Sequence, residues 1–275
     1  MWAPAASLLK LVDRWMRTVS KSRRRLRRAV LVLFVLFAWE AISGYVVPSI
    51  RPDLAILLPL PGSIITTFSQ MLIRGEIWLH SIASLKRVLV GFSLAVLIGV
   101  PLGIAIGWWG TVDKLTSPII DFLRPIPPMA WIPIGVLWFG IGDPQNIFII
   151  LIGAVFPILL NTAAGIRDAG RTLIWAAFTL GGSNRQILRE IAIPSALPMI
   201  VTGLRVGLGA GWMALVAAEL VAAPAGLGYL IENSRSYLFT EKVIVGMMVI
   251  GLLGLLMDAA MRWCANRLRM QRRLA

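Results

Sequence analysis

The chain has 275 residues, 58% of them hydrophobic, and a mean hydropathy of +0.81, whereas a water-soluble domain is about 45–50% apolar. Because the apolar excess lies in long blocks, the composition indicates a membrane protein, and the formal net charge of +14 suits an anionic membrane surface or a nucleic acid. One cysteine, Cys264, and one histidine, His80, exclude an internal disulfide and a multi-histidine metal centre, so we expect no bound metal and a structural role for His80.

Six apolar segments approach or exceed the about 20 residues that a helix needs to cross the hydrocarbon. They are 29–47, 82–109, 119–140, 146–165, 196–218 and 242–263. The first is long for a signal-peptide core and has no small-x-small cleavage pattern after it, so we expect a retained helix. An open sheet is excluded because lipid cannot satisfy its edge groups. The sequence therefore predicts an all-α polytopic membrane protein with about six transmembrane helices, between a basic segment 1–28 and a basic tail 264–275.

Lysine and arginine are distributed unequally between alternate loops. With a cytoplasmic N-terminus, the cytoplasmic pieces and the boundary residue Arg262 hold 19 of these residues, and the outer loops hold 3. Cytoplasmic loops carry the basic excess in membrane proteins. We therefore expect both termini in the cytoplasm, and we interpret the basic run 21–28 as a topology signal on anionic lipid rather than a nucleic-acid site.

The segment 119–140 contains Pro125, Pro127, Pro128 and Pro133. Because proline removes a backbone donor and clashes with the preceding turn, we expect this helix to be broken or kinked. Broken backbone at membrane depth is tolerated where protein or a water-filled cavity covers it. The segment therefore predicts a place in the bundle interior, near a pathway.

Few charged residues fall in or beside the apolar segments. The notable ones are Glu40, Asp121, Arg124, Arg205, Glu219 and Asp258. Such residues face the bundle interior, pair with each other or extend to the membrane surface. Asp258 and Arg262 are four residues apart, which predicts an ion pair. Arg205 lies about 10 Å along its helix from Pro198, so it either extends back to the cytoplasmic face or points inward.

A polar stretch, WAAFTLGGSNRQILREIAIPSALP, occupies 175–198 in the longest cytoplasmic loop, 166–195. A first helix is predicted over 171–180, and Gly181 and Gly182 fit its C-terminal stop. Ser183 followed by Gln186 is typical of a capping box that starts a second helix.

The second predicted helix places Ile187 and Ile191 on one face. We expect Pro194 to end it and Pro198 to lie in the first turn of the next span. The apolar face needs a partner, which can be the membrane surface, the chain's own helix ends or another protein.

The spacing of this stretch resembles the cytoplasmic motif of the inner-membrane permease subunits of binding-protein-dependent ABC importers. That motif reads Glu-Ala-Ala, three residues, Gly, nine residues, then Ile-x-Leu-Pro. The matching residues here are Ala176, Ala177, Gly181, Ile191, Ile193 and Pro194. Trp175 replaces the glutamate and Ile193 the leucine, so we expect Trp175 to pack rather than to pair.

Three further blocks are similar to the subfamily that moves nitrate, alkanesulfonates, taurine and related small anions. They read RPIPPMAWIPIGVLWFGIGD, LPMIVTGLRVGLGAGWMALVAAEL and IWLHSIASLKRVLVGF, and the resemblance covers about 50–265. It implies the type I ABC importer permease fold, with a permease domain over 78–263, in a bacterial inner membrane.

In that family the short helix after the glycine docks on the ATP-hydrolysing subunit. The expected docking residues are Ala176, Ala177, Gly181, Ser183, Gln186, Ile187, Ile191, Ile193 and Pro194. The resemblance also implies a homodimer, two ATPase subunits and a periplasmic solute receptor, for which the outer segment 222–241 is a candidate contact. An anionic solute suggests a cation near the pathway, and the candidate path residues are Arg124, Pro128, Arg205 and Glu219.

The chain itself is not expected to hydrolyse ATP. A phosphate loop needs a lysine directly after a glycine, and none of the five lysines follows one. We therefore expect no catalytic residue and no cofactor on this chain, with ATP and Mg²⁺ used by the partner subunit. The rival interpretations are a secondary transporter driven by an ion gradient, for which no convincing internal repeat is found, and a membrane scaffold.

Overall fold

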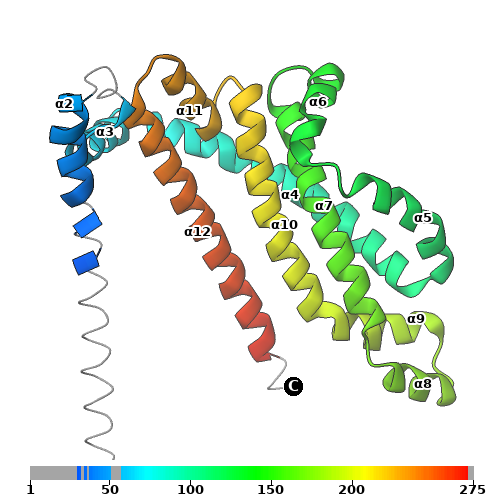
Figure 1. Ribbon diagram of the computed structural model, residues 1–275. Helices are drawn as coiled ribbons and strands as arrows, with labels where there is room; N and C mark the ends of the chain where they lie inside the picture. The colour runs from blue at the N-terminus through cyan, green and yellow to red at the C-terminus, as the bar shows by residue number, and fades with distance from the viewer. Residues whose placement is uncertain (1–29, 32–33, 36, 51–56, 272–275) are drawn as a thin grey trace, which may run out of the picture. The chain divides into compact units, whose positions relative to one another are not determined.

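The computed structural model describes residues 30–31, 34–35, 37–50 and 57–271 (Figure 1). The chain divides into two compact units, 1–67 and 68–275. In the first unit the described residues include a π-helix, Ile42–Val46, and α2, Val47–Ile50. The predicted first span, 29–47, falls partly outside the described residues, and those described within it are helical. The basic segment 1–28 lies wholly outside them.

Helix α3, Pro61–Ile73, runs across the boundary between the units, and all later elements belong to the second. Four helical stretches among the described residues are long and apolar enough to cross a membrane: Glu76–Trp108, Asp143–Arg167, Asn184–Val221 and Thr240–Ala265. They contain the helices α4 (Glu76–Trp108), α7 (Asp143–Arg167), α10 (Ile193–Val221) and much of α12 (Thr240–Gln271). Four of the predicted segments correspond to these helices in chain order: 82–109, 146–165, 196–218 and 242–263.

The predicted segment 119–140 differs from the structure. It is divided between the end of α5, Gly110–Leu123, a 3₁₀ turn, Pro128–Trp131, and α6, Ile132–Phe139. The chain leaves the helix after Arg124 because Pro125, Pro127 and Pro128 have no N–H to donate to a preceding turn. Pro133 lies at the start of α6, where a missing N–H needs no partner. The expected break is therefore present, but it separates two short helices instead of kinking one span.

Helix α7 lies between α4 and α10, and glycines allow both neighbours to approach it closely (Figure 1). A Cβ atom on Gly91 of α4 would lie 2.7 Å from Ile150, and one on Gly207 of α10 would lie 2.7 Å from Ile158. Without glycine at these places the helices would have to separate. The buried cluster of Ala95, Ala154 and Ile158 fills this region.

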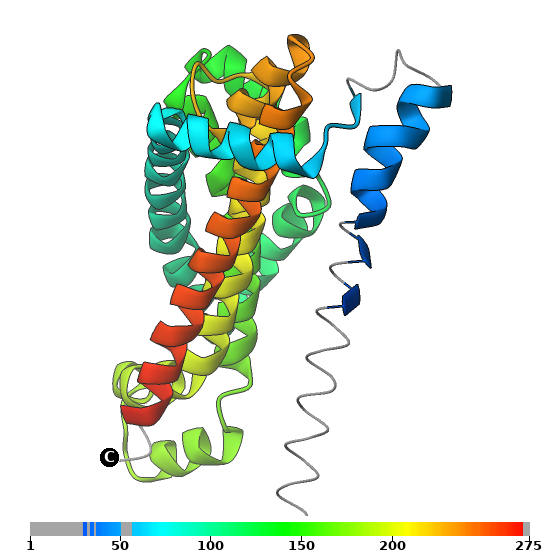
Figure 2. The same ribbon diagram turned by 90° about the vertical axis from the view of Figure 1, so that its left-hand side faces the viewer.

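Several short helices of the second unit lie at two opposite ends of the long helices (Figures 1 and 2). Helix α8, Arg171–Thr179, lies with α9, Asn184–Ile187, and the described end of α12 at one of them. Helix α6 and α11, Leu227–Ser236, lie at the other. This arrangement agrees with the predicted orientation, in which loop 166–195 and the C-terminal tail share the cytoplasmic side.

Candidate functional site: a cytoplasmic hollow and two sites between the helices

Helix α8 ends at a glycine turn, as predicted. Gly181 has a φ of +86°, in the left-handed region that favours glycine. Its N–H donates to the carbonyl of Phe178 at 3.0 Å, and the N–H of Gly182 donates to the carbonyl of Ala177 at 2.9 Å. This pair of bonds is the Schellman motif, which satisfies carbonyls at a helix end and turns the chain back toward α8.

Helix α9 begins at the predicted cap. The Oγ atom of Ser183 accepts a hydrogen bond from the N–H of Gln186 at 3.4 Å. After Ile187 the chain does not stop at Pro194, as the sequence analysis expected. It continues through a π-helix, η4 (Leu188–Ala192), into α10, so that Pro194 lies in the first turn of α10 and Pro198 lies inside that helix.

The hydrogen bonding of η4 explains how the helix continues. The N–H of Ile193 donates to the carbonyl of Leu188, five residues back, which is the π-type pattern. Pro194 follows this turn directly and lies in the first turn of α10, where proline is tolerated. The helical path therefore changes direction between α9 and α10 without ending (Figure 1).

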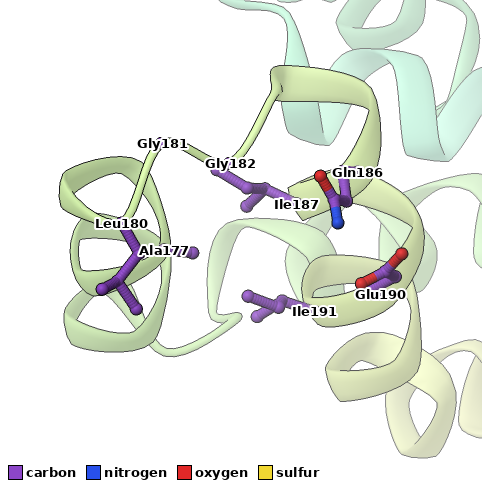
Figure 3. Close-up of a pocket in the computed structure, with 8 residues that line it drawn as sticks. All are labelled: Ala177, Leu180, Gly181, Gly182, Gln186, Ile187, Glu190 and Ile191. Carbon is purple, nitrogen blue, oxygen red and sulfur yellow. The ribbon is translucent and has the colours of Figure 1, made fainter.

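A hollow of about 270 Å³ lies between α8 and the α9–η4 segment, and we call it the cytoplasmic hollow (Figure 3). Ile187 and Ile191 point from α9 and η4 toward α8, and Ile187 is only 1% exposed. Leu180 on the α8 side is 88% exposed. The lining residues are Ala177, Leu180, Gly181, Gly182, Gln186, Ile187, Glu190 and Ile191. The isoleucines therefore shape the wall of a hollow, and Ile187 presents almost no surface of its own.

The structure brings five of the nine expected docking residues to this hollow: Ala177, Gly181, Gln186, Ile187 and Ile191. The other four support it. The carbonyl of Ala176 accepts from the N–H of Leu180 at 3.1 Å, Ser183 caps α9, and Ile193 packs against the buried cluster that includes Ala192 and Ala196. Pro194 lies in the first turn of α10.

Trp175 is mostly exposed. Its side chain is 69% exposed, and its ring lies beside that of Phe178 with the centroids 6.3 Å apart. The packing expected for Trp175 is therefore a local contact within α8. Together with Leu173 and Leu180, Trp175 gives α8 and its C-terminal turn an exposed apolar surface, which the isoleucine spacing of 187–191 did not predict.

The four candidate path residues occupy three separate places. Arg124 and Pro128 line a hollow of about 540 Å³ against α7 and α10, together with Asn161. Arg205 lines a smaller hollow of about 150 Å³ between α10 and α12. Its Nε atom donates to Oδ1 of Asp258 at 2.5 Å, so this arginine ties two spans together. Asp258 also accepts the predicted ion pair with Arg262, at 3.0 Å.

Glu219, the fourth candidate, is buried in a polar cluster near the outer end of α10. Its carboxylate pairs with Nη1 of Arg87 at 2.7 Å and accepts hydrogen bonds from Oγ of Ser84 at 2.9 Å and the N–H of Gly228 at 3.0 Å. Arg87 also contacts Oδ1 of Asp143 at 2.6 Å. Glu219 therefore joins α10 to α4 and to the start of α11, while Arg87 extends the cluster to Asp143 of α7. Glu219 lines neither of the hollows that hold the other candidates.

The loop before α11 fits against this cluster. Gly226 has a φ of +129°, and a Cβ atom there would collide with the carboxylate of Glu219. Its N–H donates to Nδ1 of His80 at 3.1 Å, which agrees with the structural role expected for this histidine. Ser84, Arg87 and Asp143 were not predicted as members of this cluster. The available signal was that a glutamate at membrane depth requires a partner, and Arg87 was one of few basic residues within the spans.

The family is shown by comparison with known proteins. Residues 99–270 match the family model described as binding-protein-dependent transport system inner membrane component. The chain therefore belongs to this family of ABC importer permeases. It is a membrane permease subunit, an inner-membrane component of the importer, and ATP hydrolysis resides on a separate subunit. The resemblance found in the motif spacing is confirmed, and the alternative of a secondary transporter gains no support.

Individual relatives cover most of the chain. A putative ABC transporter permease protein of Methanocaldococcus jannaschii is 43% identical over 83% of this chain and 85% of its own length. The taurine transport system permease protein TauC of Escherichia coli is 37% identical over 94% of this chain and 93% of its own. The bicarbonate transport system permease protein CmpB of Synechococcus elongatus is 39% identical over 69% and 68%.

A solved structure supports the fold. The inward-facing MetNI methionine ABC transporter has a chain that matches with a TM-score of 0.59 and 22% identity, over 72% of this chain and 94% of its own. At this identity the likeness concerns the fold alone, and it agrees with the predicted type I importer permease fold.

Proposed function

We propose that the chain moves a small anionic solute of the sulfonate, taurine, nitrate or bicarbonate type through the inner membrane. The subfamily resemblance in the sequence and the named substrates of TauC and CmpB support this class. In this proposal, two copies of the chain pair with two ATPase subunits, and a periplasmic receptor delivers the solute to the outer face. This chain binds no nucleotide, and the partner subunits use ATP and Mg²⁺.

The observation that carries the coupling role is the cytoplasmic hollow. It is built by a Schellman turn and a capped helix, at one end of the long apolar helices. An exposed apolar side, with Leu180, faces a side that carries Gln186 and Glu190. A side chain of the ATPase subunit suits a hollow of this size, while the helix beside the hollow docks on the surface of that subunit.

In this proposal, ATP binding draws the two cytoplasmic hollows of the paired permeases together, and the spans alternate between outward and inward access. The outer segment 222–241 is the proposed contact for the receptor. Its first part is held in place by the buried cluster of Arg87 and Glu219.

The test is ATP-driven uptake by the permease reconstituted in proteoliposomes with its ATPase and receptor. Radiolabelled taurine, an alkanesulfonate, nitrate and bicarbonate are offered in turn, with and without ATP. Uptake of one of these anions that needs ATP, and survives collapse of the ion gradients, is the expected result. Uptake that follows an ion gradient without ATP would contradict the proposal.

The glycine turn provides a matched pair of variants for the coupling role. Because Gly181 is in the left-handed region with open space around it, Gly181→Val strains the backbone, whereas asparagine tolerates this conformation. We expect Gly181→Val to reach the membrane at normal levels and to lose most ATP-driven uptake, while Gly181→Asn keeps most of it. Equal uptake by the two variants would remove the turn from the coupling role.

A further inference from the structure

We infer that His80 holds the loop before α11, residues 222–226, only while its imidazole is neutral, and that acidification of the outer compartment releases this loop. His80 is then a positioning residue for the outer end of the permease, and the position of the loop depends on a single proton. The effect is the same whichever solute the permease carries.

Three side chains on one face of α4 bind the chain at the start of α11. His80, Ser84 and Arg87 are four and three residues apart, so they lie on the same face of the helix. They bond the backbone of three consecutive residues, 225–227, at distances from 2.5 to 3.1 Å. The bond of His80 is the one in which the N–H of Gly226 donates to Nδ1, at 3.1 Å.

Of these three side chains, His80 is the one whose hydrogen bonding changes near neutral pH. Arginine stays charged and serine stays neutral, whereas histidine ordinarily gains a proton between about pH 8 and about pH 5. Nδ1 can accept from Gly226 only while it carries no proton, so the ring proton is then on Nε2. Protonation places an N–H on Nδ1 opposite the N–H of Gly226, and two donors cannot bond each other. The bond is therefore present at higher pH and is lost as the pH falls.

Gly226 has little freedom to find another acceptor in its present place. The residue is buried, and its φ of +129° is in the region that favours glycine. A Cβ atom there would collide with the carboxylate of Glu219, so the backbone lies directly against that acid. A buried N–H that loses its acceptor is unfavourable, and movement of the loop into water gives this N–H a new partner.

The titratable and charged groups around His80 come from four elements. They are Glu76 on α4, Lys242 on α12, Tyr229 on α11 and Glu219 on α10. Glu76 and Lys242 pair with each other at 3.0 Å, so their charges offset each other at the ring. The ring of Tyr229 has its centroid 5.9 Å from that of His80. Glu219 lies against the loop and has its own buried ion pair.

Glu76 offers the protonated ring a different partner. It lies four residues before His80 on α4, a spacing at which an acid and a cation attract each other. His80 therefore has two alternative states: the neutral ring bonds Gly226, and the protonated ring is attracted to Glu76. A side chain that exchanges one partner for another on protonation can act as a switch.

The released loop begins the outer segment 222–241, which is the proposed contact for the receptor. We therefore expect acidification of the outer compartment to lower the affinity of the receptor for the permease. This consequence rests on the proposed function, whereas the release of the loop does not.

The test uses the full permease chain in lipid nanodiscs with its ATPase subunits, and only the permease carries isotope-labelled histidine. Because His80 is the single histidine of the chain, nitrogen NMR reports directly which of its ring atoms carries a proton. Hydrogen exchange of residues 225–228 is followed on the same assembly between about pH 8 and about pH 5. Rates are divided by the intrinsic exchange rate at each pH, which leaves the protection that the structure provides.

We expect a bare Nδ1 atom at the higher pH. As Nδ1 gains its proton, the protection of the Gly226 amide should fall about three- to tenfold, the effect of losing one hydrogen bond. Amides in the middle of α7 serve as the control and should keep their protection. A ring that gains its proton while Gly226 stays protected overturns the inference, and so does a ring that stays neutral over the whole range.

Two substitutions at His80 separate protonation from packing. His80→Asn has an acceptor oxygen as many bonds from the backbone as Nδ1, and it gains no proton in this range, so Gly226 should stay protected throughout. His80→Leu has no acceptor, so the protection should be low throughout. A loss of protection on acidification that persists in His80→Asn would assign the proton to another group, such as Glu219, and overturn the inference.

Glu76→Gln keeps the test available if the variants of His80 do not fold. It removes the acid that attracts the protonated ring, so the NMR and exchange transitions should both move to lower pH, and by the same amount. Asp168→Asn removes one negative charge from the exposed cytoplasmic end of α7 and should move neither transition. Transitions that separate from each other in Glu76→Gln overturn the inference.

Receptor affinity, measured at both ends of the pH range, distinguishes this inference from the proposed function. If the loop is released on protonation and the receptor still binds equally well, the role of His80 stands and the proposed receptor contact at 222–241 fails. If the loop stays protected at low pH, the role of His80 fails and the proposed function stands.

Discussion

Arg87 and Glu219, 132 residues apart in the sequence, form an ion pair of 2.7 Å in which both side chains are buried. The arginine lies on α4 and the glutamate near the end of α10, so the pair joins two spans and the loop before α11. The carbonyl of Ala225 in that loop also accepts from Nη1 of Arg87, at 2.5 Å. This residue pair fixes the outer part of the second unit.

Removal of one partner is expected to be costly. In Glu219→Gln the Arg87 guanidinium loses a buried counter-charge, and a buried pair broken in this way costs about 3–5 kcal/mol. We expect a lower free energy of unfolding, measured by thermal or denaturant unfolding of the permease in detergent. Arg87→Met combined with Glu219→Leu should recover part of the loss. Arg235→Gln breaks an exposed pair with Glu232 and serves as the control, with little change.

Two glycines on the same helix should respond differently to alanine. A Cβ atom on Gly207 would lie 2.7 Å from Ile158 of α7, whereas one on Gly209 meets nothing within 4 Å. We expect Gly207→Ala to lower the free energy of unfolding by about 1–3 kcal/mol through overpacking. Gly209→Ala should be neutral or slightly stabilising, because alanine favours the helix. Thermal unfolding of both variants tests this, and equal effects would contradict the tight α7–α10 contact.

Substitutions at two apolar residues of the cytoplasmic hollow, Leu180 and Ile187, should distinguish a role in docking from a role in stability. Leu180 is 88% exposed and Ile187 is 1% exposed. Leu180→Gln is therefore expected to leave unfolding unchanged and to weaken the affinity for the ATPase subunit about tenfold, as judged by titration of one purified subunit with the other. Ile187→Ala is expected to destabilise the segment by about 2–5 kcal/mol. An unchanged affinity of Leu180→Gln for the ATPase subunit would mean that the ATPase subunit does not contact Leu180.

The cap of α9 can be tested locally. Ser183→Ala removes the oxygen that accepts from the N–H of Gln186, and the loss of such a cap costs about 1 kcal/mol. We expect faster hydrogen exchange at the amides of Gln186 and Ile187, with unchanged exchange in α7. Ser183→Asp should restore the protection, since aspartate is also a good cap. Exchange that does not respond to Ser183→Ala would mean that the cap contributes nothing.

Local signals in the sequence were sufficient to predict much of the structure of the cytoplasmic loop 166–195. The stop at Gly181 and the cap at Ser183 depend on residues within a few positions of each other, and the structure has both. The course of the chain at Pro194 was predicted wrongly. Whether a proline ends a helix depends on the hydrogen bonding of the turn before it, and the π turn of η4 is not visible in residue types alone.

Contacts between distant segments were the least predictable part. The sequence indicated that Glu219 and Arg205 needed partners, but not that these are Arg87 and Asp258. Such pairs depend on which helices become neighbours and on their rotation. The same reason applies to Arg124 and Pro128. The sequence showed that they lie close together in the chain. It could not show the hollow that they share with Asn161, because this hollow forms only when α7 and α10 lie beside the break between α5 and α6.

The helical path from α9 through η4 into α10 is uninterrupted, so this part of the chain can move as one rigid element. Its α10 arm alone has 29 residues, a length of about 44 Å. The cytoplasmic hollow lies at one end of this path. Glu219, which accepts a hydrogen bond from the N–H of Gly228 at the start of α11, lies near the other end. Because the arm is a single helix, a tilt imposed at the cytoplasmic end must displace the opposite end, and motion can pass between the two faces of the membrane without a separate relay.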